Sequence, residues 1–145
     1  MITINPDFSL GFAALVFISF LTLLLLFVLG IAVGYARAKY QVPVPQITGN
    51  ETFERVFRAH QNTIEQAVGF LPGLWLFGLT VNANLAAILG LVWIGGRILY
   101  AWGYYLEAKK RAPGFAIAML ANLVLLAGAG YGAIKLALQT ISSGN

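Results

Sequence analysis

The sequence contains no cysteine and a single histidine, His60. Without cysteine the chain can form no disulfide, no thiolate zinc site and no cysteine nucleophile, and one histidine is too little for a metal site. Charged residues are also scarce, at 10% of the 145 residues, against roughly 25% in a typical soluble domain. So few charges could not cover the surface of an ordinary soluble domain, which is therefore disfavoured.

Apolar residues are abundant, and they make up 59% of the chain. This content excludes a disordered chain, which combines low hydrophobicity with high charge. Nine Lys and Arg against five Asp and Glu give a net charge of +4. In so apolar a chain, a basic excess indicates membrane topology before nucleic-acid binding. The length fits one domain, residues 1–145.

The first apolar run, residues 10–36, contains no charged residue. It is longer than the roughly 20 residues that a helix needs to cross the hydrocarbon core. A cleavable signal peptide would begin with a basic segment and have a shorter apolar run, whereas the only charge upstream is Asp7. We therefore expect a retained transmembrane helix.

A second helix is expected after a proline-containing linker. The prolines in residues 43–45 predict extended backbone, and the capping-box spacing of Thr48 and Glu51 predicts that the helix begins near Asn50. Its first half is polar and its second half is apolar, with Pro72 inside. A membrane helix tolerates such a proline.

Two further helices complete the expected fold. An uncharged turn at 81–84 precedes the third helix, and a basic loop at 107–114 precedes the fourth. Glycines in the fourth helix suit close helix packing. The sequence therefore predicts an all-α membrane protein, a four-transmembrane-helix bundle with spans at approximately residues 10–36, 53–81, 85–106 and 114–138.

The basic residues predict the orientation of this bundle. They gather in the first loop and the polar start of the second helix, and in the third loop: Arg37, Lys39, Arg55 and Arg58, then Lys109, Lys110 and Arg111. The turn between the second and third helices has none. The positive-inside rule places both basic loops in the cytoplasm and both termini on the opposite side, in a bacterial inner membrane or the endoplasmic reticulum.

Ionisable groups inside membrane helices are costly, so they are functional candidates. In the second helix Arg58, Asn62 and Glu65 are four and three residues apart and share one face. The third helix presents a second polar face, provided that it extends into the basic loop: Arg97, Tyr100, Tyr104 and Arg111. Together these faces predict a polar site between helices.

The residue types suit a small zwitterionic ligand with excess negative charge. Arginine grips a carboxylate with two parallel hydrogen bonds, Glu65 takes an ammonium group, and Asn62 and the tyrosines satisfy peptide groups. Other roles stay open at this point. Arg58 and Glu65 could pair with each other, Arg97 could pair with a carboxylate on a neighbouring helix, and the tyrosines could belong to an interfacial belt.

Two stretches, FERVFRAHQNTIE at 53–65 and RILYAWGYYLEAKKRAP at 97–113, resemble the MAPEG family, the membrane-associated proteins of eicosanoid and glutathione metabolism. The resemblance extends from about Arg37 to the fourth span. It implies a homotrimer of four-helix subunits that binds glutathione between adjacent subunits, near the cytoplasmic side. Glutathione would be the co-substrate, and no metal is implied.

The resemblance also implies roles for single residues. Positions of the glutathione site in the leukotriene synthase branch match Arg37, Arg58, Asn62, Glu65, Tyr100, Tyr104 and Arg111. Arg111 matches the thiol-activating arginine. His60 replaces a glutamine there, although the prostaglandin synthase branch also has histidine after Arg-Ala, and we expect it among the binding residues. Gln66 replaces a tyrosine, and Ala38 replaces a second arginine.

Three functions compete at this stage. The first is a glutathione transferase, with peroxidase activity as a possible addition, that acts in detoxification or eicosanoid metabolism on lipophilic electrophiles from the bilayer. The second is a non-enzymatic lipid-binding scaffold of the lipoxygenase-activating type. The third, a small multidrug transporter, is disfavoured because such a protein would place a carboxylate in the first span, and residues 10–36 contain none. The identity of the electrophile stays open.

Overall fold

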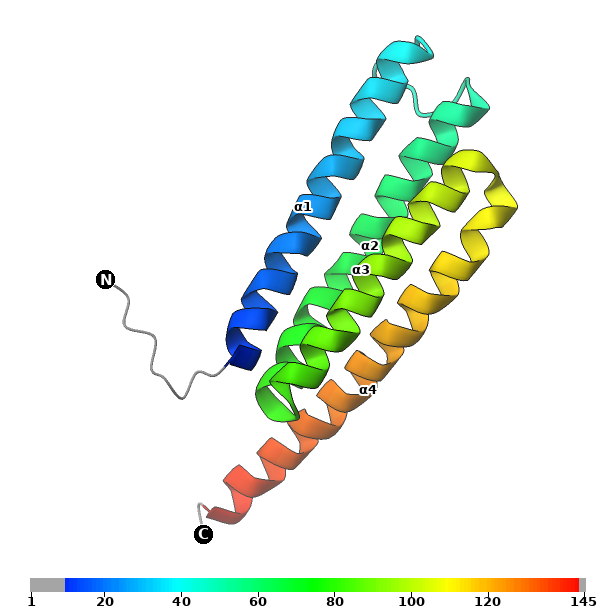
Figure 1. Cartoon of the computed structure of the whole chain (residues 1–145). Helices are drawn as coiled ribbons and strands as arrows, with labels where there is room; N and C mark the ends of the chain where they lie inside the picture. The colour runs from blue at the N-terminus through cyan, green and yellow to red at the C-terminus, as the bar shows by residue number, and fades with distance from the viewer. Residues whose placement is uncertain (1–9, 144–145) are drawn as a thin grey trace.

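Helices form nearly the whole of the described chain. The computed structural model describes residues 10–143, and these form four α-helices and one short 3-10 turn (Figure 1). The elements are α1 (Leu10–Lys39), α2 (Glu51–Thr80), α3 (Ala83–Leu106), the turn η1 (Ala108–Arg111) and α4 (Ala112–Ser143). The described residues contain no strand, so the all-α prediction is confirmed there. Asp7 lies outside the described residues.

Three segments are long and apolar enough to cross a membrane: α1, α3 and the segment Ala108–Ser143. α2 has the same length as α1, at 30 residues, but its first turn carries Glu51 and Glu54. Pro72 lies within α2 without ending it. The second predicted span, residues 53–81 in α2, therefore stays a prediction.

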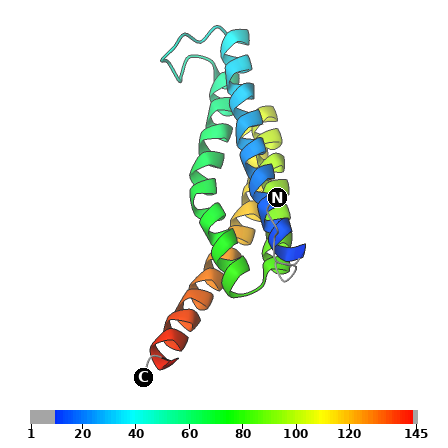
Figure 2. The ribbon, with the colours of Figure 1, turned by 90° about the vertical axis from the view of Figure 1, so that its left-hand side faces the viewer.

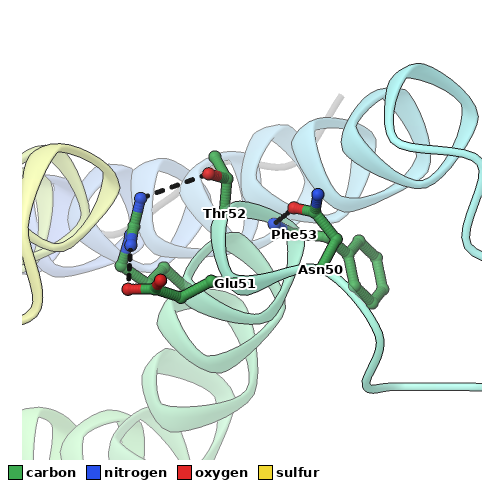
Figure 3. Close-up of polar contacts among 5 residues, drawn as sticks. Asn50, Glu51, Thr52 and Phe53 are labelled. Atoms are coloured by element: carbon green, nitrogen blue, oxygen red, sulfur yellow. Dashed lines mark hydrogen bonds and ion pairs between the residues drawn. The ribbon is translucent and has the colours of Figure 1, made fainter.

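The second helix begins where the sequence predicts, but through a different cap. Asn50 has extended backbone, and its side-chain oxygen accepts a hydrogen bond of 3.0 Å from the Phe53 N–H (Figure 3). Asparagine is a favourable N-cap because this bond satisfies an orphan amide of the first turn. The amide of Gly49 donates to Glu54 Oε1 at 3.0 Å. The expected capping box of Thr48 and Glu51 is thus replaced by Asn50 and Glu54.

The third helix begins two residues before the predicted span and ends with it at Leu106, whereas the fourth helix is longer than predicted at both ends. α3 ends at Leu106 because Glu107 is extended, with φ −160° and ψ 140°. The basic residues that follow form η1, so α3 does not extend into the basic loop as far as Arg111. α4 begins directly after it and runs to Ser143, past the predicted end at residue 138.

The two basic connections lie at the same end of the bundle. In Figure 1 the α1–α2 linker and η1 are both at the upper end, whereas the α2–α3 turn is at the lower end. Figure 2 shows that the last part of α4 projects past that turn. This arrangement is the one that the positive-inside rule assumes, and the side of the membrane stays a prediction.

Close helix contacts and large apolar side chains form the core. The rings of Phe70 and Trp93 stack with their centroids 3.9 Å apart. A Cβ on Gly128 would meet the Phe77 ring, which confirms close packing there, whereas a Cβ on Gly130 would meet nothing within 4 Å. Most apolar side chains on the outer helix faces are exposed, as expected for a surface that meets lipid.

Candidate functional site

A polar pocket of about 160 Å³ lies between α2, α3 and η1. The side chains that line it come from both of the polar faces seen in the sequence: Arg58, Gln61, Asn62, Glu65, Tyr100, Tyr104 and Arg111. Arg58, Glu65 and Arg111 are exposed on the surface of the chain, so the pocket is open at its outer edge. Six of the seven residues are among the sequence candidates.

Gln61 is the pocket residue that sequence reasoning missed. It lies three residues after Arg58 and four before Glu65, so the spacing that selected the others also selects it. Its side-chain carbonyl oxygen is buried without a hydrogen-bond partner among the described residues. Gln61 therefore lines the pocket while this oxygen itself is shielded from solvent.

The two tyrosines are buried in the bundle and do not form an interfacial belt. Tyr100 is 3% exposed and Tyr104 is 9% exposed, and their ring centroids are 5.7 Å apart. Both rings rise from α3 one turn apart, at the level of the basic end. Both tyrosines nevertheless line the polar pocket.

Arg111 reaches the pocket because η1 folds back against α3. Its guanidinium carbon lies 4.7 Å from the centroid of the Tyr104 ring, within reach of a cation–π interaction. Gly103 makes the approach possible, since a Cβ there would collide with the carbonyl group of Lys110. Arg111 thus lines the pocket with the other candidates, and a turn, not a longer α3, brings it there.

Arg97 is fully buried and has no carboxylate partner among the described residues. Its Nη2 donates to Thr63 Oγ1 at 2.6 Å and to Asn62 Oδ1 at 3.1 Å, and its Nε donates to Thr63 Oγ1 at 3.2 Å. The guanidinium carbon lies 4.0 Å from the centroid of the Tyr100 ring. The alternative in which Arg97 pairs with a carboxylate is wrong within this chain, because a hydroxyl, an amide and a ring surround the cation.

Arg58 and Glu65 do not pair with each other. The ion pairs of the described residues join Arg55 to Glu51 and Lys110 to Glu107, both within a few residues of chain. The idea that Arg58 and Glu65 neutralise each other is therefore wrong in this chain. Both side chains stay available to a ligand in the pocket.

Arg37 and His60 do not line this pocket. Nη1 of Arg37 donates to three backbone carbonyl oxygens of the α1–α2 linker: those of Val42 at 3.2 Å, Pro43 at 3.2 Å and Gln46 at 2.7 Å. His60 faces α1, where a Cβ on Gly30 would lie 3.5 Å from its Nε2. These two candidates are therefore separated from the other six within one chain.

A second hollow adjoins the polar pocket and is partly apolar. It has a volume of about 360 Å³ and shares three side chains with the pocket, while α4 adds an apolar wall: Asn62, Tyr100 and Arg111, with Ala112 and Phe115. Among residues 10–143 no group of three or more His, Asp or Glu gathers as a metal site would require. The arrangement suits a ligand with carboxylate, ammonium and peptide groups beside an apolar reactant.

The family profile described as MAPEG matches residues 15–131, which is most of the chain. The chain belongs to the MAPEG family. The resemblance noted from 53–65 and 97–113 is thereby confirmed, and both pocket-forming faces fall within the matched region.

Several curated proteins are similar to this MAPEG chain. An uncharacterized protein of Synechocystis is 56% identical over 112 residues, which cover 77% of this chain and 82% of that protein. Human microsomal glutathione S-transferase 2 is 50% identical over 100 residues, 68% of either chain. Bovine leukotriene C4 synthase is 40% identical over 97 residues, 66% of this chain and 65% of that protein. Glutathione-conjugating membrane proteins are thus among its relatives.

Proposed function

We propose that this MAPEG protein is an integral membrane glutathione transferase that joins the thiolate of glutathione to lipophilic electrophiles from the bilayer. The polar pocket carries the proposal, because it gathers three charged residues, two amides and two phenols at one end of an otherwise apolar bundle. Peroxidase activity toward lipid hydroperoxides is an extension of the same chemistry. The similarity to human microsomal glutathione S-transferase 2 supports the choice of thiol.

The pocket offers a partner for each functional group of glutathione. Arg58 binds a carboxylate, and Glu65 binds the ammonium group. Asn62 and the tyrosines serve the peptide groups. Holding the tripeptide at several points fixes the position of its thiol.

Arg111 is the proposed catalytic residue. A cation beside a thiol lowers its pKa, so more of the glutathione is present as the nucleophilic thiolate. The thiol proton leaves to solvent, the thiolate sulfur forms a bond to the electrophilic carbon, and the leaving group departs with its electron pair. Because the sulfur comes from glutathione, a chain without cysteine can perform this reaction.

The electrophile is expected in the hollow beside the polar pocket. That hollow adjoins Arg111 and has Phe115 of α4 in its wall. Exposed apolar side chains cover the neighbouring helix faces, so a lipophilic molecule can arrive sideways from the bilayer. Both basic connections are proposed to face the cytoplasm, where glutathione would enter the pocket.

A homotrimer is part of the proposal. The pocket is open at its outer edge, and Arg37 and His60 lie outside it. If glutathione binds between adjacent subunits, as the family resemblance implies, these two residues serve the pocket of a neighbouring subunit.

The second candidate is a non-enzymatic lipid-binding scaffold of the lipoxygenase-activating type. Its support is the large exposed apolar surface. The pocket favours the enzyme, because a scaffold has no need of clustered Arg58, Glu65 and Arg111.

The deciding experiment measures turnover by detergent-purified protein. Glutathione is supplied with an aryl halide and, separately, with a lipid hydroperoxide, and Arg111→Ala is compared with Lys110→Ala. We expect Arg111→Ala to bind glutathione but to lose about 10- to 100-fold in kcat, because one to two units of thiol pKa are lost. Lys110→Ala should keep wild-type turnover, since Lys110 does not line the pocket. No turnover and no glutathione binding by the wild type would favour the scaffold.

A further inference from the structure

The fully buried guanidinium of Arg97 is a charge without a carboxylate partner among the described residues, at the junction of α2 and α3. Burying a charge without an opposite charge beside it is unfavourable, so the groups that surround this one need an explanation. The guanidinium donates hydrogen bonds to the Thr63 hydroxyl and the Asn62 amide, and it contacts the face of the Tyr100 ring. Two of these three, Asn62 and Tyr100, line the polar pocket.

The hydrogen bonds that Thr63 forms define the direction of its hydroxyl group. Thr63 Oγ1 donates to the Ala59 carbonyl oxygen at 2.7 Å, so its proton is used. The same oxygen accepts from Nε and Nη2 of Arg97 at 3.2 Å and 2.6 Å. The guanidinium is therefore held in one plane by a hydroxyl that is itself anchored to the backbone of α2.

The same logic fixes the Asn62 amide. A guanidinium has donors and no acceptors, so the Asn62 atom that faces it at 3.1 Å must be the carbonyl oxygen. The NH₂ group of Asn62 is then the end that remains for the pocket. Asn62 therefore acts toward a ligand as a donor, and it suits a carbonyl or carboxylate oxygen.

We propose that Arg97 is a positioning residue, which aligns the Asn62 amide so that its two N–H donors serve the ligand in the polar pocket. This inference rests on the proposed glutathione site. The planar fork of arginine lets one side chain bond to Thr63 and Asn62 together, while the Tyr100 ring covers the guanidinium. Lysine lacks that plane and could not hold both partners in fixed directions.

Glutathione affinity, measured by calorimetry on the detergent-purified protein, tests the proposal in the variants Arg97→Met, Asn62→Ala and the double variant. We expect Arg97→Met and Asn62→Ala each to weaken binding about tenfold, as loss of one charge-assisted or aligned hydrogen bond would. The double variant should bind no more than about twofold more weakly than Asn62→Ala, because Arg97 acts through Asn62. Effects that multiply would overturn the proposal.

Thermal unfolding of the same samples separates positioning from a structural role. Methionine removes a buried charge and also its hydrogen bonds to Thr63 and Asn62, so glutathione affinity is compared at a temperature well below the unfolding midpoint of every variant. A lower midpoint with unchanged glutathione affinity would contradict the proposal. Thr63→Val covers the case in which Arg97→Met does not fold: it should weaken glutathione binding several-fold, whereas Thr63→Ser, which keeps the hydroxyl, should not.

Asn62→Asp tests the direction of the amide. Aspartate keeps an oxygen for Arg97 but replaces the NH₂ donor with a second oxygen. We expect binding at least as weak as in Asn62→Ala, and wild-type affinity would contradict the assigned orientation. Absence of glutathione binding by the wild-type protein would refute the proposed function itself, which is a different outcome from normal wild-type binding with an unaffected Arg97→Met.

Discussion

Glu65 is an exposed carboxylate near the end of the polar half of α2, next to Ile64, which is 42% exposed. It forms no ion pair with any described residue. A charge in such a position is expensive unless a partner arrives, and the cation that the proposed function supplies is the ammonium group of glutathione. Single residues of this kind carry the chemical argument.

Replacement of Glu65 by glutamine should weaken glutathione binding about tenfold, because a charge-assisted contact to the ammonium group is lost. N-acetylglutathione, which has no ammonium group, should bind equally weakly to the wild type and to Glu65→Gln. Titration calorimetry with both peptides checks this, and Glu51→Gln, at a surface ion pair of the same helix, is the control. A tenfold loss with both peptides would argue for a general defect of the pocket.

Periodicity finds residues that share a helix face but not the partners that they meet. It grouped Arg58, Asn62 and Glu65, which all line the polar pocket, and it could have grouped Gln61 with them. It could not show that Arg97 meets Thr63, because that contact depends on how α2 and α3 are placed in space. The hydrogen bonds from Arg37 to the linker carbonyls could not be predicted from the sequence for the same reason.

At the scale of elements, the short turn η1 decides where Arg111 lies. Glu107 leaves the helical conformation, and the turn then packs on Gly103. A Cβ on Gly114 would likewise collide with the backbone of Tyr100, so α4 also begins against α3 without a gap. The sequence predicted a basic loop here, but its fold depends on these backbone contacts, which composition does not encode.

Gly103→Ala should displace η1, because the added methyl group collides with the carbonyl group of Lys110. We expect a loss of about 1–3 kcal/mol in stability, as for other overpacked sites, together with lower kcat because Arg111 moves. Gly95→Ala on the same helix is the control, since a Cβ there meets nothing within 4 Å; alanine should stabilise that position by about 1 kcal/mol. Thermal unfolding and aryl-halide turnover measure both variants, and wild-type values for Gly103→Ala would argue against the role of η1.

The whole molecule presents apolar helices to lipid and a polar pocket at one end. Composition predicted the all-α membrane class because hydrophobic runs and charge positions directly encode it. The assembly is not encoded in this way. Whether Arg37 serves its own pocket or that of a neighbour depends on the contact between subunits.

Mixed trimers of Arg37→Ala and Arg111→Ala subunits test the proposed assembly. If Arg37 serves a neighbouring pocket, about a quarter of the sites in randomly mixed trimers combine an intact Arg111 with an intact Arg37. Turnover should therefore recover to about a quarter of wild type, although each variant alone is nearly inactive. Co-expressed subunits with two affinity tags provide the sample, and turnover that stays at the level of the single variants would show that Arg37 does not act across the subunit contact.

Calorimetric titration of the detergent-purified protein with glutathione, in two buffers of different ionisation heat, tests whether the pocket binds glutathione and ionises its thiol. We expect saturable binding with release of a proton from the thiol near neutral pH, and binding without that release in Arg111→Ala. Absence of saturable glutathione binding to the wild-type protein would contradict the account.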